Sequence, residues 1–132
     1  MSENFRKESE PKVNNNEISE IIEKRNTVML NDIADKLGEY YARGRDRERL
    51  SSSQIRNILD RIQRMKRFDK NEIQLLRPAL AYAAGKDRTG KLKHLHSIID
   101  NAIKLVDNEE KFENFRNFFE AIVAYHRYHG GK

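Results

Sequence analysis

The 132-residue chain has no cysteine, two prolines, six glycines and no long apolar run. The absence of cysteine excludes disulfide scaffolds, cysteine nucleophiles and thiolate metal sites. No stretch approaches the roughly 18–20 apolar residues that a membrane-spanning helix requires. The N-terminal sequence MSENFRKESEPK is polar and charged, without the apolar segment of a signal peptide. We therefore expect a soluble, cytoplasmic protein.

The sequence motifs of common enzyme sites are missing as well. There is no G-x-S-x-G, H-E-x-x-H or glycine-rich phosphate loop. His94 and His96 are two residues apart and would point to different faces of a helix. His126 and His129 are three apart but lack further ligands, and Ser51 is explained by helix capping. We expect no catalytic residue, no metal and no cofactor, and hence no enzyme.

The chain is rich in charge and poor in apolar residues. Charged residues make up 36% and apolar residues 37%, against a norm of roughly 25% and 45–50%. The net charge of +5 is unevenly distributed. Residues 43–93 hold 15 basic and 6 acidic side chains, net +9, whereas residues 1–42 carry −3 and residues 94–132 carry −1. A thin helical domain with a nucleic-acid partner fits this pattern better than an enzyme with a large pocket.

The chain divides into a polar tail and one helical domain. Residues 1–16 have few apolar side chains, which predicts disorder. Residues 17–132 follow a helical hydrophobic period without strand-like alternation. The first predicted helix covers 17–43, and Asn26-Thr27 offers a local cap at which it can break.

Capping signals mark the next two helices. Ser51 and Gln54 are predicted to form an S-x-x-Q capping box, and Asp69 and Glu72 a second capping box. Pro78 should kink or split the second of these helices.

The remaining boundaries follow from glycines and further caps. Gly85 is placed to end the third helix as its C′ residue, and 91–106 forms the fourth. Asp107 offers the cap of a fifth helix that stops at Gly130. The predicted fold is all-α: a compact bundle of about five helices with no sheet.

The cations gather in the middle of the chain. The run RGRDRER occupies 43–49. By 100° stepping, Arg56, Arg64 and Arg67 face away from the apolar stripe of the second helix, with Asp60 able to pair among them. Two interpretations stay open: a solvated, salt-bridged surface or a strip that binds phosphates. No aromatic residues interleave with these cations, so base stacking is not indicated.

Three helical segments are distinctive when taken in series. They read LSSSQIRNILDRIQRMK (50–66), LRPALAYAAGKDR (76–88) and FFEAIVAYHRYHGG (118–131). In this order they resemble the small subunit of type III-A CRISPR (Csm) effector complexes. The chain departs from the family at Lys86, where an arginine is more usual. Lysine keeps the charge but not the bidentate phosphate contact.

The resemblance implies a helical, non-enzymatic subunit present in several copies along a guide-RNA ribonucleoprotein. Copies would stack as an inner filament beside the crRNA-bound backbone subunits and reach toward the large polymerase-like subunit. They would clamp the guide–target duplex by charge and shape in antiviral defence, with sequence left to base pairing. RNA cleavage would belong to the backbone subunits, and signalling and DNase chemistry to the large subunit. The predicted RNA-binding residues are Gln54, Arg56, Arg64, Arg67, Arg77, Lys86 and Arg88.

Other functions stay open at this point. The bundle can be a protein scaffold without RNA contact, or a small basic helix-turn-helix protein that binds DNA. A metal-dependent nuclease built on the incomplete histidine pair is a third possibility. The low apolar content also leads us to expect self-association, as a dimer or weak oligomer alone and a filament in the complex.

Overall fold

The computed structural model describes residues 10–132 and leaves 1–9 undescribed. Between residues 10 and 132 the chain forms seven helices and no strand. The helices are α1 (Asn15–Ile22), α2 (Thr27–Ala42), α3 (Ser52–Arg64), α4 (Lys70–Gln74), α5 (Leu76–Lys86), α6 (Lys91–Ile103) and α7 (Glu109–Tyr128). The predicted all-α class is confirmed. There are seven helices rather than five because two of the predicted helices are each divided once.

The first division lies at Asn26, as the capping signal indicated. The Asn26 side chain accepts a hydrogen bond from the Met29 backbone N–H at 3.1 Å and caps α2. Arg25, directly before it, has a left-handed φ of 53° and turns the chain out of α1.

The segment that precedes α1 lies against the bundle. Disorder was predicted for residues 1–16, and 1–9 of these lie outside the described residues. Residues 10–16 differ from that expectation. The Pro11 carbonyl accepts a hydrogen bond from Nε2 of His94 at 2.8 Å, Val13 packs against the core, and Asn14 caps α1. The helical body therefore begins before residue 17.

The next two helices begin at the predicted caps. The Gln54 backbone donates to Ser51 Oγ at 3.2 Å, and the Ser51 backbone donates to Gln54 Oε1 at 3.1 Å. At α4, Asp69 accepts hydrogen bonds from the backbone of Glu72 and Asn71. Because these bonds favour the charged carboxylate, they lower the pKa of Asp69.

Pro78 divides the third predicted helix, as expected. α4 ends at Gln74 and α5 begins at Leu76. Proline has no N–H to donate to the carbonyl of Gln74, four residues earlier, and its ring crowds that carbonyl. The division therefore falls at Leu75.

Several predicted helix boundaries are wrong. α6 ends at Ile103 rather than near residue 106. Gly85 is not a C′ residue, because α5 continues through it to Lys86 and Gly85 has no left-handed φ. The cap of α7 is Asn108 rather than Asp107, and its side chain accepts from the Lys111 backbone at 2.8 Å. Asp and Asn cap almost equally well, so the sequence could not separate these neighbours.

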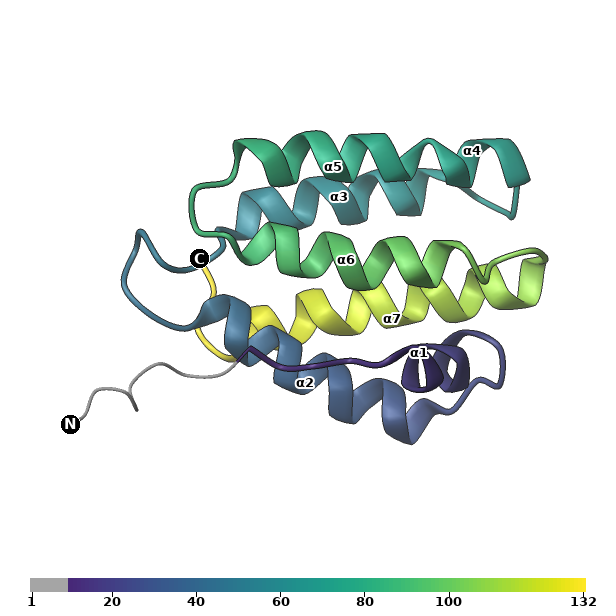
Figure 1. The fold of residues 1–132 in the computed structure, drawn as a ribbon, viewed down its shortest axis with the longest axis horizontal. Helices are drawn as coiled ribbons and strands as arrows, with labels where there is room; N and C mark the ends of the chain where they lie inside the picture. The colour runs from purple at the N-terminus through teal and green to yellow at the C-terminus, as the bar shows by residue number, and fades with distance from the viewer. Residues whose placement is uncertain (1–9) are drawn as a thin grey trace.

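The core is built around α7, which packs most extensively against α2 and also contacts α3 and α1. α2 and α7 run side by side in the same direction (Figure 1). Their close approach occurs at Gly38, where an added Cβ would lie 2.6 Å from the backbone of Tyr125 and His126. The four phenylalanines of α7 are all fully buried: Phe112, Phe115, Phe118 and Phe119.

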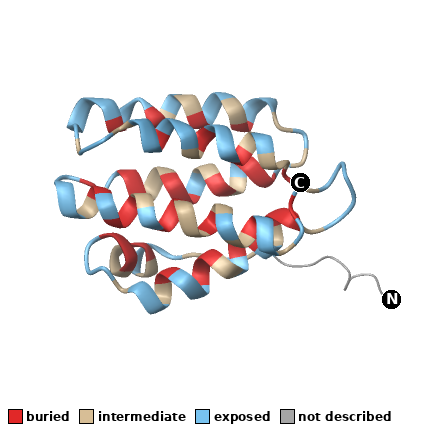
Figure 2. Cartoon of the chain, turned by 180° about the vertical axis from the view of Figure 1, so that it is seen from behind, coloured by how far each residue is buried: buried red, intermediate tan, exposed pale blue. Residues whose placement is uncertain are grey.

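α3 and α5 form the layer farthest from α1 and α2 (Figure 1). α5 packs on α6, and α3 packs on both α7 and α5. Buried residues lie on the inward helix faces, while exposed residues cover the outward faces and loops (Figure 2). Among residues 10–132, no helix is long and apolar enough to cross a membrane.

Candidate nucleic-acid interface

The outward face of α3 carries three exposed arginines. The isoleucines of α3 are buried, whereas Arg56, Arg61 and Arg64 are exposed. Arg61 was not among the predicted site residues. The predicted pairing of Asp60 is not formed: between residues 10 and 132, no ion pair joins Asp60 to Arg56 or Arg64.

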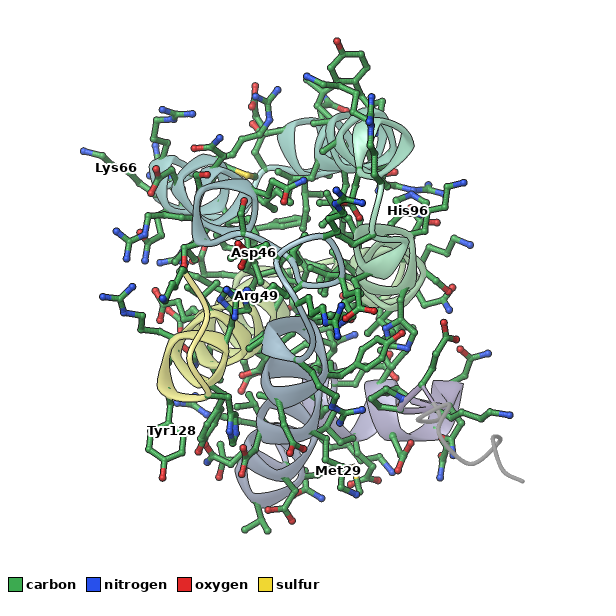
Figure 3. All side chains as sticks on the ribbon, turned by 90° about the vertical axis from the view of Figure 1, so that its left-hand side faces the viewer. Met29, Asp46, Arg49, Lys66, His96 and Tyr128 are labelled. Atoms are coloured by element: carbon green, nitrogen blue, oxygen red, sulfur yellow. The ribbon has the colours of Figure 1, made fainter. Side chains whose placement is uncertain are left out.

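Lys66 and Arg67 continue the row of cations beyond the end of α3. The prediction that Arg67 shares a helix face with Arg64 is wrong, because α3 ends at Arg64 and Met65 is its C-cap. The Phe68 backbone N–H donates to Glu109 Oε1 at 2.7 Å and ties this loop to α7. Both cations are exposed, and Lys66 extends outward from the bundle (Figure 3).

We call Arg56, Arg61, Arg64, Lys66 and Arg67 the α3 basic surface. None of the five forms an ion pair with a carboxylate within the described range. Their positive charges are therefore available to an anionic partner.

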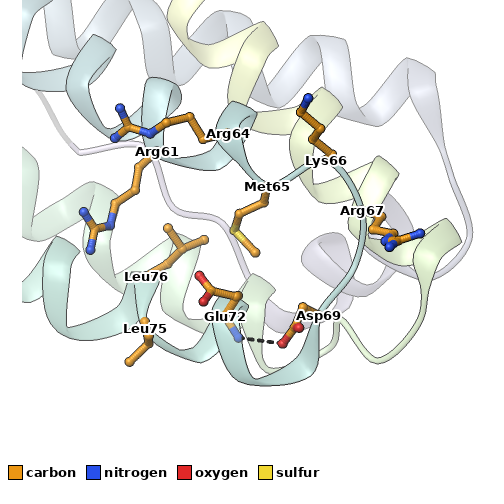
Figure 4. Close-up of a pocket in the computed structure, with 9 residues that line it drawn as sticks. All are labelled: Arg61, Arg64, Met65, Lys66, Arg67, Asp69, Glu72, Leu75 and Leu76. Carbon is orange, nitrogen blue, oxygen red and sulfur yellow. Dashed lines mark hydrogen bonds between the residues drawn. The ribbon is translucent and has the colours of Figure 1, made fainter.

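An open pocket of about 470 Å³ lies between the end of α3 and α4 (Figure 4). Four members of the α3 basic surface line it: Arg61, Arg64, Lys66 and Arg67. Asp69 and Glu72 lie at its lower side in the same view. The pocket thus brings together two predicted residues, Arg64 and Arg67, and opposes them with two carboxylates.

A second groove, of about 680 Å³, runs between α3 and α5 and brings Gln54 and Lys86 to one site. Most of the hydrogen-bonding capacity of Gln54 is already used inside the protein. Its Oε1 accepts from Ser51, and its Nε2 donates to Asp87 at 3.2 Å. Gln54 therefore joins the start of α3 to the turn that follows α5.

Asp87 holds that turn in place. Its carboxylate accepts from Thr89 Oγ1 at 2.7 Å, from the Leu92 backbone at 3.1 Å and from Gln54. Burial alone raises the pKa of Asp87, but these hydrogen bonds outweigh it and the pKa is lowered. Asp87 thus fixes the start of α6 and the position of the exposed Arg88 in the same loop.

An aromatic residue lies beside the cations of this groove, contrary to prediction. The Lys86 ammonium lies over the ring of Tyr82, 5.0 Å from its centroid. The two residues are one helical turn apart, and the helix had been predicted to end at Gly85, before Lys86. The extension of α5 therefore created the pair.

Arg77 lies apart from the other predicted residues, on the α6 side of α5. Its guanidinium binds the Asp100 carboxylate through Nε at 2.6 Å and Nη2 at 3.2 Å, and Nη1 reaches Gln74. The pair raises the pKa of Arg77 and lowers that of Asp100. Arg77 is therefore occupied inside the protein.

The loop 43–49 neutralises part of its own charge. Arg49 forms an ion pair with Asp46, and the two side chains lie next to each other in Figure 3. The Arg45 backbone donates to Glu48 Oε1 at 2.7 Å. Arg45 and Arg47 remain exposed at this end of the bundle.

The histidines make separate hydrogen bonds rather than a cluster. His126 Nε2 lies 2.8 Å from the Leu50 carbonyl, and His129 Nε2 lies 2.5 Å from Asp35 Oδ1. His94 lies between Tyr41 and Pro11. Across residues 10–132, no three side chains of metal-ligating type come together.

Comparison with known proteins gives the family. Residues 24–132 match the family profile described as Csm2 Type III-A. A curated relative from Streptococcus thermophilus, named "CRISPR system Cms protein Csm2", is 34% identical over 92 residues, covering 63% of this chain and 75% of the relative. No solved structure matches the chain. The chain belongs to the Csm2 family, the small subunits of type III-A CRISPR (Csm) complexes.

Proposed function

We propose that this subunit binds the guide–target RNA duplex of its complex through the α3 basic surface and performs no catalysis itself. The observation that carries the proposal is the set of five exposed cations that have no carboxylate partner within residues 10–132. Phosphate groups of an RNA backbone are the anions that such an arrangement fits best, because arginine and lysine bind them without reading sequence.

The geometry of α3 suits a backbone-tracking role. Its 13 residues span about 20 Å at 1.5 Å per residue. Arg56 lies in the first half of the helix, Arg61 and Arg64 lie in the second half, and Lys66 and Arg67 follow. Cations are therefore spread along the helix rather than gathered at one point, which favours several phosphates over a single anion.

A helix-turn-helix mode of DNA binding is less well supported. The second helix of the pair is divided at Leu75 into α4, with five residues, and α5. Arg56, Arg61 and Arg64 of the α3 basic surface lie on α3, the first helix of the pair, whereas a helix-turn-helix protein reads DNA with the second.

The proposed assembly includes other Csm subunits and further copies of this chain, arranged as the filament that the family resemblance implies. Four large apolar residues are exposed between residues 10 and 132: Val28, Leu75, Tyr82 and Tyr128. Exposed apolar side chains provide contact area for such neighbours. Light scattering over a concentration series tests self-association, and a monomer at every concentration contradicts it.

Salt-dependent RNA binding by the full chain tests the central proposal. A guide–target duplex should bind with an affinity that falls linearly on a log–log plot against salt. The double variant Arg56→Glu and Arg64→Glu should weaken binding to unrelated sequences equally. It should also reduce the salt slope by about two, one for each lost phosphate contact.

A matched control changes the same number of charges elsewhere. Lys12 and Lys36 are exposed and lie outside the α3–α5 layer, so Lys12→Glu with Lys36→Glu should bind RNA nearly as the unaltered chain does. If both double variants lost RNA affinity equally, the loss would reflect net charge alone and not the α3 basic surface. Unchanged affinity in the α3 variant would leave a protein scaffold as the function. Co-purification of the chain with guide RNA and backbone subunits tests whether it belongs to the proposed complex.

A further inference from the structure

The groove between α3 and α5 has a composition unlike that of the neighbouring pocket. Its residues are Gln54, Asn57, Ile58, Arg61, Leu75, Leu76, Pro78, Ala79, Leu80, Tyr82, Ala83 and Lys86. They combine an apolar floor with amides and two cations, and none of them carries a carboxylate. The α3–α4 pocket, in contrast, contains Asp69 and Glu72. An anionic ligand therefore meets no repulsion from the groove's own lining.

An exposed aromatic ring borders the groove. Tyr82 is 71% exposed, although it is among the largest apolar side chains of α5. Lys86 lies over one face of the ring, which leaves the opposite face for a planar ligand. Nucleobases are planar and stack on such rings whatever their identity, because each base has a π face.

Asn57 supplies an unused hydrogen-bonding group in the same groove. Its side chain is exposed and makes no hydrogen bond within the described residues. A primary amide carries both a donor and an acceptor, which matches the mixed edge of a nucleobase. Gln54 is less available because Ser51 and Asp87 already engage it.

Arg61 and Lys86 lie on the two helices that flank the groove and are available to phosphates. Neither forms an ion pair with a carboxylate within the described range. Arg61 also lines the α3–α4 pocket, so it connects the groove to the α3 basic surface. An RNA strand bound along that surface would therefore pass beside the groove.

We propose that the α3–α5 groove binds an unpaired nucleobase of the RNA, stacked on Tyr82, with Asn57 on its polar edge and Arg61 and Lys86 on the adjoining phosphates. The inference rests on the proposed RNA-binding function and adds a site for a single base to it. A protein segment is the competing occupant, and the test below distinguishes the two.

The experiment compares three RNA duplexes of equal length: fully paired, with one unpaired adenosine, and with one unpaired abasic residue. The abasic duplex has the same backbone irregularity but no base. The unaltered chain should bind the adenosine duplex about tenfold more tightly than the abasic one, as expected for one stacked base. A 2-aminopurine in the unpaired position should lose fluorescence on binding.

Variants at exposed positions separate stacking from apolar contact. Tyr82→Phe should keep the preference for the base, whereas Tyr82→Leu should abolish it while fully paired duplex still binds. Asn57→Ala should reduce the preference in part. Tyr128→Leu is the matched control, because Tyr128 is 79% exposed and lies outside the groove.

The possible results assign each failure to one proposal. If the unaltered chain binds paired duplex with the expected salt dependence but does not distinguish adenosine from the abasic residue, the groove is no base site and the proposed function stands. If Tyr82→Leu lowers self-association and leaves the preference intact, the groove is a protein contact. If no duplex binds, both proposals are wrong.

Discussion

Arg77 and Asp100 join α5 to α6 through two hydrogen bonds between a guanidinium and a carboxylate, at 2.6 and 3.2 Å. The pair occupies a residue that the sequence had placed among the RNA contacts. Arg77→Ala should therefore lower the melting temperature and change RNA affinity by less than about twofold, because the charge it removes is already paired. Arg64→Ala breaks no ion pair, so it should leave the melting temperature nearly unchanged and weaken RNA binding by more than Arg77→Ala does.

Asp100→Asn provides the complementary measurement. It releases Arg77 without removing its charge. If RNA affinity rises in this variant and falls in Arg77→Ala, Arg77 contacts RNA after all, and its pairing with Asp100 competes with that contact.

Gly38 and Gly85 are both helical glycines but should respond oppositely to alanine. At Gly38 a Cβ would lie 2.6 Å from the α7 backbone, whereas at Gly85 it would meet no atom within 4 Å. Gly38→Ala should destabilise the protein by about 1–3 kcal/mol through overpacking. Gly85→Ala should stabilise it by roughly 0.4–1 kcal/mol, as chemical denaturation can measure. A loss of stability in Gly85→Ala would instead indicate that Gly85 has the left-handed conformation of a C′ residue, as the sequence predicted.

The difference between these two glycines illustrates what local sequence can and cannot reveal. Capping boxes and a proline act within four residues, so Ser51, Asp69 and Pro78 predicted the starts and the division of helices correctly. Gly85 was misassigned because a glycine near a helix end is common at C′, while the actual end is fixed by Asp87 through bonds to α3 and α6. Those partners are distant in sequence.

The candidate site, too, was predictable only where it depends on local sequence. The basic character of α3 follows from its sequence, and Arg61 could have been found from its spacing of seven residues after Gln54, which places both on one helix side. The availability of each cation could not be read in this way. Arg77 is occupied by Asp100, 23 positions away, and Tyr82 joins Lys86 only because α5 continues past Gly85.

The buried His126 should make stability fall in mildly acidic solution. Burial lowers the pKa of His126; the Leu50 carbonyl raises it less, and Arg127 and Lys91 lower it further. In the unfolded chain the pKa of the histidine is about 6.5, so the unfolded histidine binds a proton more readily than the folded one. The contribution of His126 to the free energy of unfolding is therefore complete above pH ~6.5. It declines as the pH falls from that value toward the folded pKa, by at most about 1.4 kcal/mol per pH unit.

The measurement compares pH profiles of unfolding free energy. His126→Gln retains an N–H that can reach the Leu50 carbonyl but cannot titrate. Its profile should be flatter than that of the unaltered chain between pH 6.5 and the folded pKa. Parallel profiles would mean that His126 titrates alike in both states.

His94 should matter more to stability than His96, two residues away. It links the Tyr41 hydroxyl at 2.7 Å to the Pro11 carbonyl at 2.8 Å. In His94→Ala the fully buried Tyr41 loses its partner, at a cost of about 1–3 kcal/mol. His96 makes no hydrogen bond within the described residues, so His96→Ala should cost less than ~0.5 kcal/mol.

Limited proteolysis provides a second measurement for the same variants. Loss of the bond to Pro11 should loosen the segment before α1 and speed tryptic cleavage after Lys12 in His94→Ala, but not in His96→Ala. Equal cleavage rates would show that other contacts, such as those of Val13, hold the segment.

The parallel pairing of α2 with α7 has a consequence for biosynthesis. The helix that packs most extensively against α2 is α7, the last helix of residues 10–132, and residues 43–108 lie between the two. During translation the apolar face of α2, with Ile33, Leu37 and Tyr41, therefore emerges from the ribosome long before its partner. The bundle cannot close helix by helix from its N-terminus, and the nascent chain must keep that face from wrong partners until α7 has been made.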